Sequence, residues 1–290
     1  MTSMIRMVLA VLLFAAATAT AVTSTNPEIL TTYDKSLSTT ANISLATKSV
    51  PDLSGRDESD ADGSILGLEL PAVYESDGAT IISRCTVPDT VALTYDDGPF
   101  MYTDTLLDIL EEKGVKATFF ILGDSNSRLS DYKEMVQRAH REGHQIASHT
   151  WSHKDLSMMD SQQIREEMTE LDHAIENLLG VKPVYMRPPF GGLSTTAKKT
   201  LASMGYNIVL WNHDTNDWRH PSDVNENLIP IRQAVSSGDT QGHIILMHDV
   251  IEKTVTELTL QAIELVRSKG FRMVTVGECL GKPKSAWYRE

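Results

Sequence analysis

The apolar residues from position 91 onward follow two alternating periodicities. Short apolar runs, typical of buried strands, are separated by segments in which apolar residues recur every three or four positions, as on one face of a helix. The runs predict strands at residues 91–95, 117–122, 145–148, 184–186, 206–211, 244–247 and 272–276. The periodic segments predict helices at residues 104–113, 132–142, 161–179, 195–204, 225–236 and 255–269. We expect Ser161 to cap the third helix and Pro230 to bend the fifth.

A repeated strand-then-helix order is typical of α/β proteins with parallel sheets. Seven predicted strands within residues 91–276 favour a (β/α) barrel over an open sheet, in a single domain. In barrels of this kind, functional side chains gather at the carboxyl ends of the strands. We therefore expect the chemistry of this chain to lie just after its predicted strands.

The N-terminus has the pattern of a targeting segment. Arg6 precedes an uninterrupted apolar run at residues 7–17, and residues 19–21 form a small-x-small cleavage site. The run is too short to cross a bilayer comfortably. We predict a secretory signal peptide at residues 1–21, with an uncleaved anchor as the alternative. The expected location is extracellular or in the cell wall, with no membrane contact after signal removal.

The segment that follows is rich in Ser, Thr and Asp and has no sustained period. This composition predicts a flexible pro-segment or linker at residues 22–66. Asn42 begins an N-glycosylation sequon within it. The catalytic domain is then expected at residues 67–290, with its core at about 85–280.

Charge and cysteine content narrow the choice of partners and compartment. The chain has 39 acidic and 26 basic residues and a formal charge of −13. This acidic balance argues against nucleic acid as a partner. We expect the protein to be a monomer. Cys85 and Cys279 flank the predicted core. In an exported protein such a pair predicts a disulfide, with metal binding as the weaker alternative.

Polar side chains follow the first and third predicted strands. Asp96 and Asp97 come directly after a buried run, and Gly98 ends the strand. His149 and His153 follow the third strand, and their i, i+4 spacing would place them on one face if the segment were helical. Two histidines and one carboxylate suit a hydrolytic zinc centre or a non-haem iron oxygenase. The second usually occurs on an all-β scaffold, whereas the alternating strands and helices of this sequence predict an α/β protein.

Three later strand ends carry further candidates. Arg187 is followed by two prolines, which fix a rigid turn able to aim a guanidinium and a backbone N–H into a cleft. Residues 214–218 read Asp-Thr-Asn-Asp-Trp, and His248 follows the sixth strand. Alone, the Asp pair and the Arg turn would more often be plain surface turns, a single strand-end histidine would more often be structural, and the His149 and His153 pair would be surface residues about as often as ligands. Five motifs, each at the end of a predicted strand, together indicate a functional site.

Taken in order, these motifs resemble those of the polysaccharide deacetylase family, carbohydrate esterase family four. They read Thr-Tyr-Asp-Asp-Gly-Pro, Ser-His-Thr-Trp-Ser-His, Arg-Pro-Pro-Phe-Gly, Asp-Thr-Asn-Asp-Trp and Leu-Met-His-Asp. The resemblance spans residues 91–276, the whole predicted core. The cysteine placement and the C-terminal tail are similar to those of secreted fungal chitin deacetylases. Tyr95 and Phe190 stand where many members have Phe and Tyr, respectively.

The resemblance implies a distorted (β/α) barrel that binds a divalent metal, usually Zn²⁺, with Co²⁺ possible. By position, the metal ligands would be Asp97, His149 and His153. Asp96 would be the general base, oriented by Arg187.

The family pattern also implies His248 as the general acid, paired with Asp217, although Asp214 is an alternative partner. The pocket would be lined by three further residues: Phe190, Trp218 and Leu246. The implied reaction is hydrolysis of N-acetyl groups on N-acetylglucosamine units of chitin or chitin oligosaccharides, giving chitosan and acetate. Acetylxylan and peptidoglycan deacetylases share these motifs and remain alternatives. A carbohydrate-binding protein with an inactive site is the alternative outside the enzymes.

Overall fold

The computed structural model describes residues 71–125, 127–236 and 240–290. The predicted signal peptide and linker, with the sequon at Asn42, lie outside the described residues. Within the described part of the chain, none of the helices is both long and apolar enough to cross a membrane.

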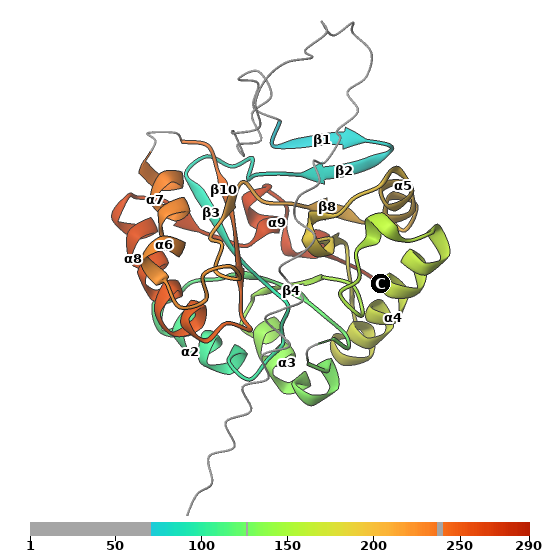
Figure 1. Ribbon diagram of the computed structural model, residues 1–290, viewed down its shortest axis with the longest axis horizontal. Helices are drawn as coiled ribbons and strands as arrows, with labels where there is room; N and C mark the ends of the chain where they lie inside the picture. Colours follow the sequence, from blue (N-terminus) through green and yellow to red (C-terminus); the bar gives the residue numbers. More distant parts are fainter. Residues whose placement is uncertain (1–70, 126, 237–239) are drawn as a thin grey trace, which may run out of the picture. The chain divides into compact units, whose positions relative to one another are not determined.

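In the described part of the chain, ten strands form one curled sheet (Figure 1). Only the β1–β2 pair is antiparallel among the described strand pairs of this sheet, so the predicted distorted (β/α) barrel is confirmed. Along the sheet the strands are β1 (Val73–Ser76), β2 (Ala79–Ile82), β8 (Asn207–Val209), β7 (Tyr185–Met186), β5 (Gln145–Ser148), β4 (Thr118–Ile121), β3 (Thr90–Asp96), β10 (His243–His248) and β9 (His213–Asp214), with β11 (Arg272–Met273) beside β3.

The larger helices surround these strands (Figure 1). Their amphipathic sequences bury one apolar face against the sheet, as the leucines of α2 do at positions 106, 107 and 110. The helices are α2 (Thr103–Lys113), α3 (Lys133–Arg141), α4 (Ser161–Leu179), α5 (Thr195–Ser203), α6 (Val224–Asn227), α7 (Ile229–Ser236), α8 (Thr259–Ser268) and α9 (Val276–Cys279).

The centre of the core lies along β3 and β10. All positions of both strands are buried, as expected for parallel strands covered on both faces. This explains why their sequences read as apolar runs rather than as alternating patterns. The two strands present their last residues, Asp96 and His248, at one end of the barrel.

Several predicted helix boundaries needed correction. The N-cap of α4 is Asp160, not Ser161; its side chain accepts from the N–H groups of Gln162 and Gln163. The helix predicted at residues 225–236, with a bend at Pro230, is divided into α6 and α7, and the break at Leu228 lies two residues before the proline. The last long helix is preceded by a π-helical turn at Thr254–Leu258.

Two strand predictions also differ from the structure. The predicted strand at residues 272–276 ends at Met273, and residues 276–279 form α9. Thr275 caps this helix together with Glu278, so the capping box prevails over the β-branched residues on either side. The hairpin of β1 and β2 was not predicted.

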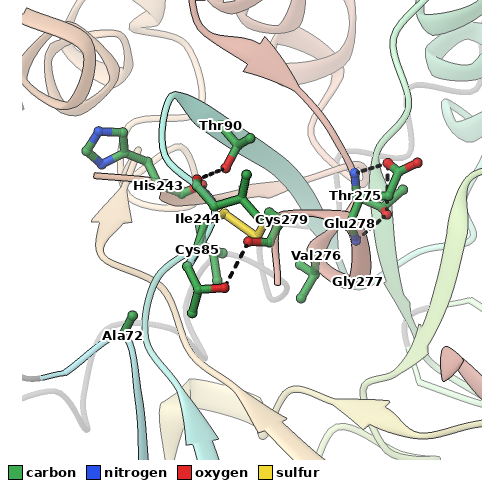
Figure 2. Close-up of a disulfide and its surroundings, with 12 residues drawn as sticks. Ala72, Cys85, Thr90, His243, Ile244, Thr275, Val276, Gly277, Glu278 and Cys279 are labelled. Carbon is green, nitrogen blue, oxygen red and sulfur yellow. Dashed lines mark hydrogen bonds between the residues drawn. A yellow bond between two sulfur atoms is a disulfide. The ribbon is translucent and has the colours of Figure 1, made fainter. Parts of the chain in front are cut away.

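The predicted disulfide between Cys85 and Cys279 is confirmed, and Figure 2 shows it beside the start of β10. Both cysteines are buried. The backbone oxygen of Cys279 accepts hydrogen bonds from the N–H groups of Thr86 and Val87, at 3.0 and 2.9 Å. The bond therefore ties the segment before the central strand to the helix that follows β11.

The last residues pack onto the barrel as well. β12 (Tyr288–Arg289) pairs antiparallel with β6 (Lys182–Pro183) in a separate two-stranded sheet. The Tyr288 hydroxyl accepts a hydrogen bond from the N–H of Ile146 at 3.0 Å. Trp287 is buried and packs on Gly277, where any side chain would collide with the indole.

Candidate active site

The predicted base and acid positions lie on neighbouring strands. Asp96 is the last residue of β3, and His248 is the last residue of β10. The parallel register pairs these two residues directly. Adjacent strands lie about 4.8 Å apart, so the sheet itself holds the carboxylate and the imidazole side by side.

The three predicted metal ligands form a compact cluster. One ligand atom from each of Asp97, His149 and His153 can be chosen so that all three lie within 4.8 Å of one another. Asp97 Oδ1 lies 3.2 Å from His153 Nε2 and 3.5 Å from His149 Nε2. Asp97 and His149 are buried, and His153 is 15% exposed, so one side of the cluster is accessible.

Hydrogen bonds and burial set the protonation of the cluster. His149 Nδ1 lies 2.7 Å from the backbone oxygen of Arg187, and because a carbonyl only accepts, Nδ1 carries a hydrogen and Nε2 is the nitrogen that faces Asp97. Burial lowers the pKa of His153 to about 4, although the Asp97 carboxylate opposes this. Burial alone would raise the pKa of Asp97, but hydrogen bonding to His149 and the surrounding histidine charges hold that pKa below its ordinary value.

This donor set fits a divalent metal ion. Neutral imidazoles and an ionised carboxylate are the forms that bind a cation. Catalytic zinc sites use three such ligands and leave a fourth position open. The hydrogen bond from His149 to a backbone carbonyl is the outer contact that commonly orients a ligating imidazole. Two nitrogen donors favour zinc or a related transition metal over calcium or magnesium.

The segment that carries both histidines is a loop, so the condition for a shared helical face is not met. Thr150 and His153 adopt left-handed φ angles of 75° and 58°, and Asp97 has a φ of 72°. Such conformations cost about 1–3 kcal/mol each at non-glycine residues and persist only when the surrounding structure imposes them. The imidazoles of His149 and His153 therefore meet because the loop folds back on itself.

Arg187 fixes one oxygen of Asp96. The guanidinium is fully buried, and its Nη1 donates to Asp96 Oδ1 at 2.7 Å and to Thr94 Oγ1 at 2.8 Å. Its Cζ atom lies over the Phe120 ring, 4.1 Å from the ring centroid. The other oxygen of Asp96, Oδ2, lies 3.7 Å from His149 Nε2 and faces the metal-ligand cluster. The arrangement leaves one oxygen of Asp96 free of the arginine and directed toward the cluster.

Asp217, rather than Asp214, is the partner of His248. Asp217 Oδ1 lies 2.7 Å from His248 Nδ1, and its Oδ2 accepts from the backbone N–H of His248 and from Thr254 Oγ1, both at 2.8 Å. Asp214 instead accepts from the backbone N–H of Asn216 at 2.7 Å. These contacts fix the imidazole with Nδ1 toward the carboxylate.

The charges around His248 favour its protonated form. Burial opposes the positive charge, but attraction and hydrogen bonding to Asp217, with further help from Asp97 and Asp96, raise the pKa of His248 to about 10. With Nδ1–H donated to Asp217, the Nε2–H remains for another acceptor. The pair can therefore hold a proton at neutral pH.

The three predicted pocket residues lie on the segments that carry these groups. Phe190 is 49% exposed, and its ring centroid lies 4.8 Å from that of His153. Leu246 lies two residues before His248 on β10, so both side chains point to the same side of the sheet. Trp218 is half-buried and directly follows the carboxylate that pairs with His248.

Two buried carboxylates close to these groups were not predicted. Glu167 on α4 contacts the histidine loop; its signal in the sequence is an acidic residue on a helix face that also carries Ile164 and Met168. Asp249 is fully buried, and its Oδ2 accepts from Thr103 Oγ1 at 2.7 Å. A Cβ atom at Gly98 would collide with the Asp249 carboxylate, so this close approach requires glycine.

Burial raises the pKa of Asp249 to about 7, and the charges of Asp97 and Asp96 add to this effect against the Thr103 hydrogen bond. The sequence offers no comparable signal for Asp249, because it simply follows His248 at a strand end.

The strand ends of this barrel bring together a cluster of two histidines and one carboxylate, a second carboxylate and a protonated histidine. Metal-dependent hydrolases use groups of these kinds. Residues 83–209 match the family model described as polysaccharide deacetylase. A chitin deacetylase of Pestalotiopsis sp is 46% identical over 211 residues, which cover 72% of this chain and 70% of the relative. The chain belongs to the polysaccharide deacetylase family.

Further similarities lie within the same family. The structure of the chitin deacetylase from Colletotrichum lindemuthianum superposes with a TM-score of 0.71 at 37% identity, covering 73% of this chain and 96% of that one. A peptidoglycan-N-acetylglucosamine deacetylase of Listeria monocytogenes is 35% identical over 193 residues, which cover 66% of this chain and 39% of the relative.

Proposed function

We propose that this protein is a metal-dependent deacetylase that hydrolyses N-acetyl groups of N-acetylglucosamine units in chitin or chitin oligosaccharides, giving chitosan and acetate. The observation that carries the proposal is the direct pairing of Asp96 and His248 across neighbouring strands beside the Asp97, His149 and His153 cluster. The similarity to two fungal chitin deacetylases supports chitin as the substrate.

Asp97, His149 and His153 would hold the metal, with Zn²⁺ favoured and Co²⁺ as a substitute of similar ligand preference. A divalent ion bound there supplies a Lewis acid that polarises the acetyl carbonyl and makes a water molecule easier to deprotonate.

Asp96 is the general base of the proposal. Its Oδ2 faces the cluster and takes the proton of the attacking water, while Arg187 holds Oδ1 and keeps the carboxylate in position. A general base typically contributes about 10²–10⁴-fold to the rate. Thr94 supports the guanidinium from the same strand as Asp96.

His248 is the general acid. An amide nitrogen leaves only after it has gained a proton, and the Nε2–H of His248 supplies that proton while Asp217 stabilises the imidazolium through Nδ1–H. The backbone N–H of Phe190 would stabilise the oxyanion, a contact whose loss typically costs about 10²–10³ in rate. Trp218 would wall the pocket, and Leu246 would contact the acetyl methyl group.

Acetate release tests the substrate. The zinc-loaded protein is assayed side by side on chitin oligosaccharides, acetylxylan and peptidoglycan, and we expect the highest kcat/KM on chitin oligosaccharides. Preferred release from peptidoglycan would favour the alternative that the Listeria relative supports. Metal and chitin binding without acetate release from any substrate would identify a carbohydrate-binding protein with an inactive site.

Three variants test the roles of the residues. Asp96→Asn and His248→Ala should keep zinc and lose about 10²–10⁴ in rate. His149→Ala should lose zinc and activity together, whereas His173→Ala, an exposed histidine on α4, should change neither. Near-normal turnover in Asp96→Asn would refute the base assignment.

Export is part of the proposal. The disulfide between Cys85 and Cys279 supports an oxidising compartment, where such bonds persist. A signal peptide at residues 1–21, a linker at residues 22–66 and a catalytic domain at residues 67–290 complete the expected organisation. N-terminal sequencing of protein collected from the medium should find Val22 first; an intact Met1 would indicate an uncleaved segment.

A further inference from the structure

Glu167 reaches from α4 to the loop that carries the metal-ligand histidines. Its side chain is 6% exposed. Oε2 accepts the backbone N–H of Ser152 at 2.8 Å, and Oε1 accepts Ser152 Oγ at 2.5 Å and Lys154 Nζ at 3.1 Å. Both oxygens of Glu167 therefore bind Ser152, immediately before His153, and Oε1 also binds Lys154, immediately after it.

The two histidines of the cluster are held in different ways. The His149 ring is oriented directly, through Nδ1 and the Arg187 carbonyl. Among the described residues, the Nδ1 atom of His153 has no such hydrogen-bond partner; its ring contacts are with His149 and Phe190. Asp97 Oδ1 lies 3.2 Å from His153 Nε2, so the direction of the His153 ring depends on that contact and on the backbone that carries the ring.

That backbone is in an unfavourable conformation. Thr150 and His153 both have left-handed φ angles, which non-glycine residues adopt only when neighbouring groups impose them. Among the contacts of this stretch, the N–H of His153 donates to Thr150 Oγ1 at 3.1 Å, and the N–H of Ser152 donates to Glu167; the Trp151 carbonyl also accepts from the N–H groups of Gly123 and Asp124, at 3.0 and 2.8 Å. The first lies within the loop, whereas the second anchors the loop to a long helix.

We propose that Glu167 is a positioning residue for His153, which keeps the loop in the conformation that presents the His153 imidazole to the metal. The inference rests on the metal site of the proposed function. Outer groups that orient metal ligands typically change metal affinity by about 10–100-fold when they are removed. Glu167→Ala should therefore weaken zinc binding by about 10–100-fold.

A second buried carboxylate on the same helix provides a matched comparison. Asp172 is 5% exposed and accepts from the Tyr206 hydroxyl at 2.5 Å and from Arg289 Nη2 at 2.6 Å. These contacts anchor the C-terminal strand and do not involve the histidine loop. Asp172→Asn should therefore lower the melting temperature and leave zinc affinity unchanged.

The experiment measures metal binding independently of turnover. The full chain and the variants Glu167→Gln, Glu167→Ala, Asp172→Asn and Glu170→Gln are stripped of metal, and zinc affinity is measured by competition with a chromogenic chelator. Glu170 is exposed on the same helix and controls for the loss of one negative charge. Visible absorption of the Co²⁺-loaded proteins reports the coordination geometry, and thermal unfolding of the metal-free proteins reports stability.

We expect weaker zinc binding and an altered cobalt spectrum for both Glu167 variants, with a smaller change for Glu167→Gln, which keeps one acceptor oxygen. Wild-type zinc affinity and a wild-type cobalt spectrum in Glu167→Gln and Glu167→Ala would overturn the inference. If Glu167→Ala does not fold, the zinc affinity and cobalt spectrum of Glu167→Gln alone test the inference: wild-type values would overturn it, and changed values would support it.

The result also separates this inference from the proposed function. A wild-type chain that binds no zinc would refute both. A wild-type chain that binds zinc but releases no acetate would refute only the proposed activity, and the Glu167 variants would still test the positioning role.

Discussion

Replacing Asp217 with Asn tests the proposed proton donor most directly. The substitution keeps the size of the side chain and removes the charge that lies against His248 Nδ1 at 2.7 Å. Two unit charges about 4 Å apart interact by about 4 kcal/mol at an effective dielectric constant of about 20. At about 1.4 kcal/mol for each pH unit, this corresponds to a fall of about 3 in the pKa of His248.

The sign of the effect follows from the environment of the imidazole. The pKa of His248 is raised to about 10 although burial opposes the charge, so loss of Asp217 leaves burial less opposed and brings the pKa down toward its ordinary value. The variant imidazole then loses its proton at a lower pH than the wild-type imidazole. The alkaline limb of kcat/KM should therefore move to lower pH in Asp217→Asn.

The assay is the pH profile of kcat/KM on a chitin oligosaccharide. Both proteins carry the same metal, so the charge of the ion cancels in the comparison. Thr254→Val is the control, since it removes one hydrogen bond to Asp217 and keeps the charge; its alkaline limb should move by less than about one pH unit. An unchanged alkaline limb in Asp217→Asn would refute the assignment of His248 as the acid.

Three further predictions concern stability and positioning. The double variant Cys85→Ala/Cys279→Ala should lose up to about 5 kcal/mol of unfolding free energy in urea, since the bond closes a loop of 194 residues. The raised pKa of Asp249 means that the unfolded wild type loses this proton from about pH 4, whereas the folded wild type keeps it until about pH 7, so wild-type stability falls over that range. Asn cannot titrate, so Asp249→Asn should be increasingly more stable than the wild type, both without metal, from about pH 4 to about pH 7. The gain in thermal unfolding experiments should reach at most about 4 kcal/mol. Arg187→Lys should keep zinc and lower kcat at least about tenfold, because an ammonium cannot replace the planar contacts that hold Asp96.

Each of these predictions has a result that would contradict it. Equal urea midpoints for the reduced and oxidised wild-type protein would argue against a stabilising bond. A stability difference between Asp249→Asn and wild type that does not change with pH would mean that Asp249 does not titrate with a raised pKa. Wild-type turnover in Arg187→Lys would show that Asp96 needs no guanidinium.

The strand-end motifs could be predicted because each is contiguous and follows an apolar run. Val91, Ala92 and Leu93 identify the central strand, and the barrel topology then brings Asp96 and His248 to the same end. The choice between Asp214 and Asp217 could not be made in this way. Both lie in one short loop, and only its folded path directs Asp217 to the backbone and ring of His248.

Other differences come from local contacts that override periodicity. The spacing of His149 and His153 matches a helix, but left-handed residues turn the segment into a loop. The hairpin at residues 73–82 did carry a recognisable signal: Asp77-Gly78, the kind of pair that favours a tight turn between antiparallel strands. Glu167 illustrates the reverse case, in which an acidic residue on an apolar helix face marks a contact made outside the helix.

The direct register between the ends of β3 and β10 separates the spacing of the proton-transfer groups from the recognition of the polymer. Evolution or design could therefore vary the two independently. Backbone ladders in the interior fix the spacing between the two proton-transfer groups, whereas surface segments such as those around Met101 and Met158, both exposed, can change in length and composition. Selectivity for a different acetylated polymer could therefore be engineered by exchanging these surface segments while the reacting groups keep their separation.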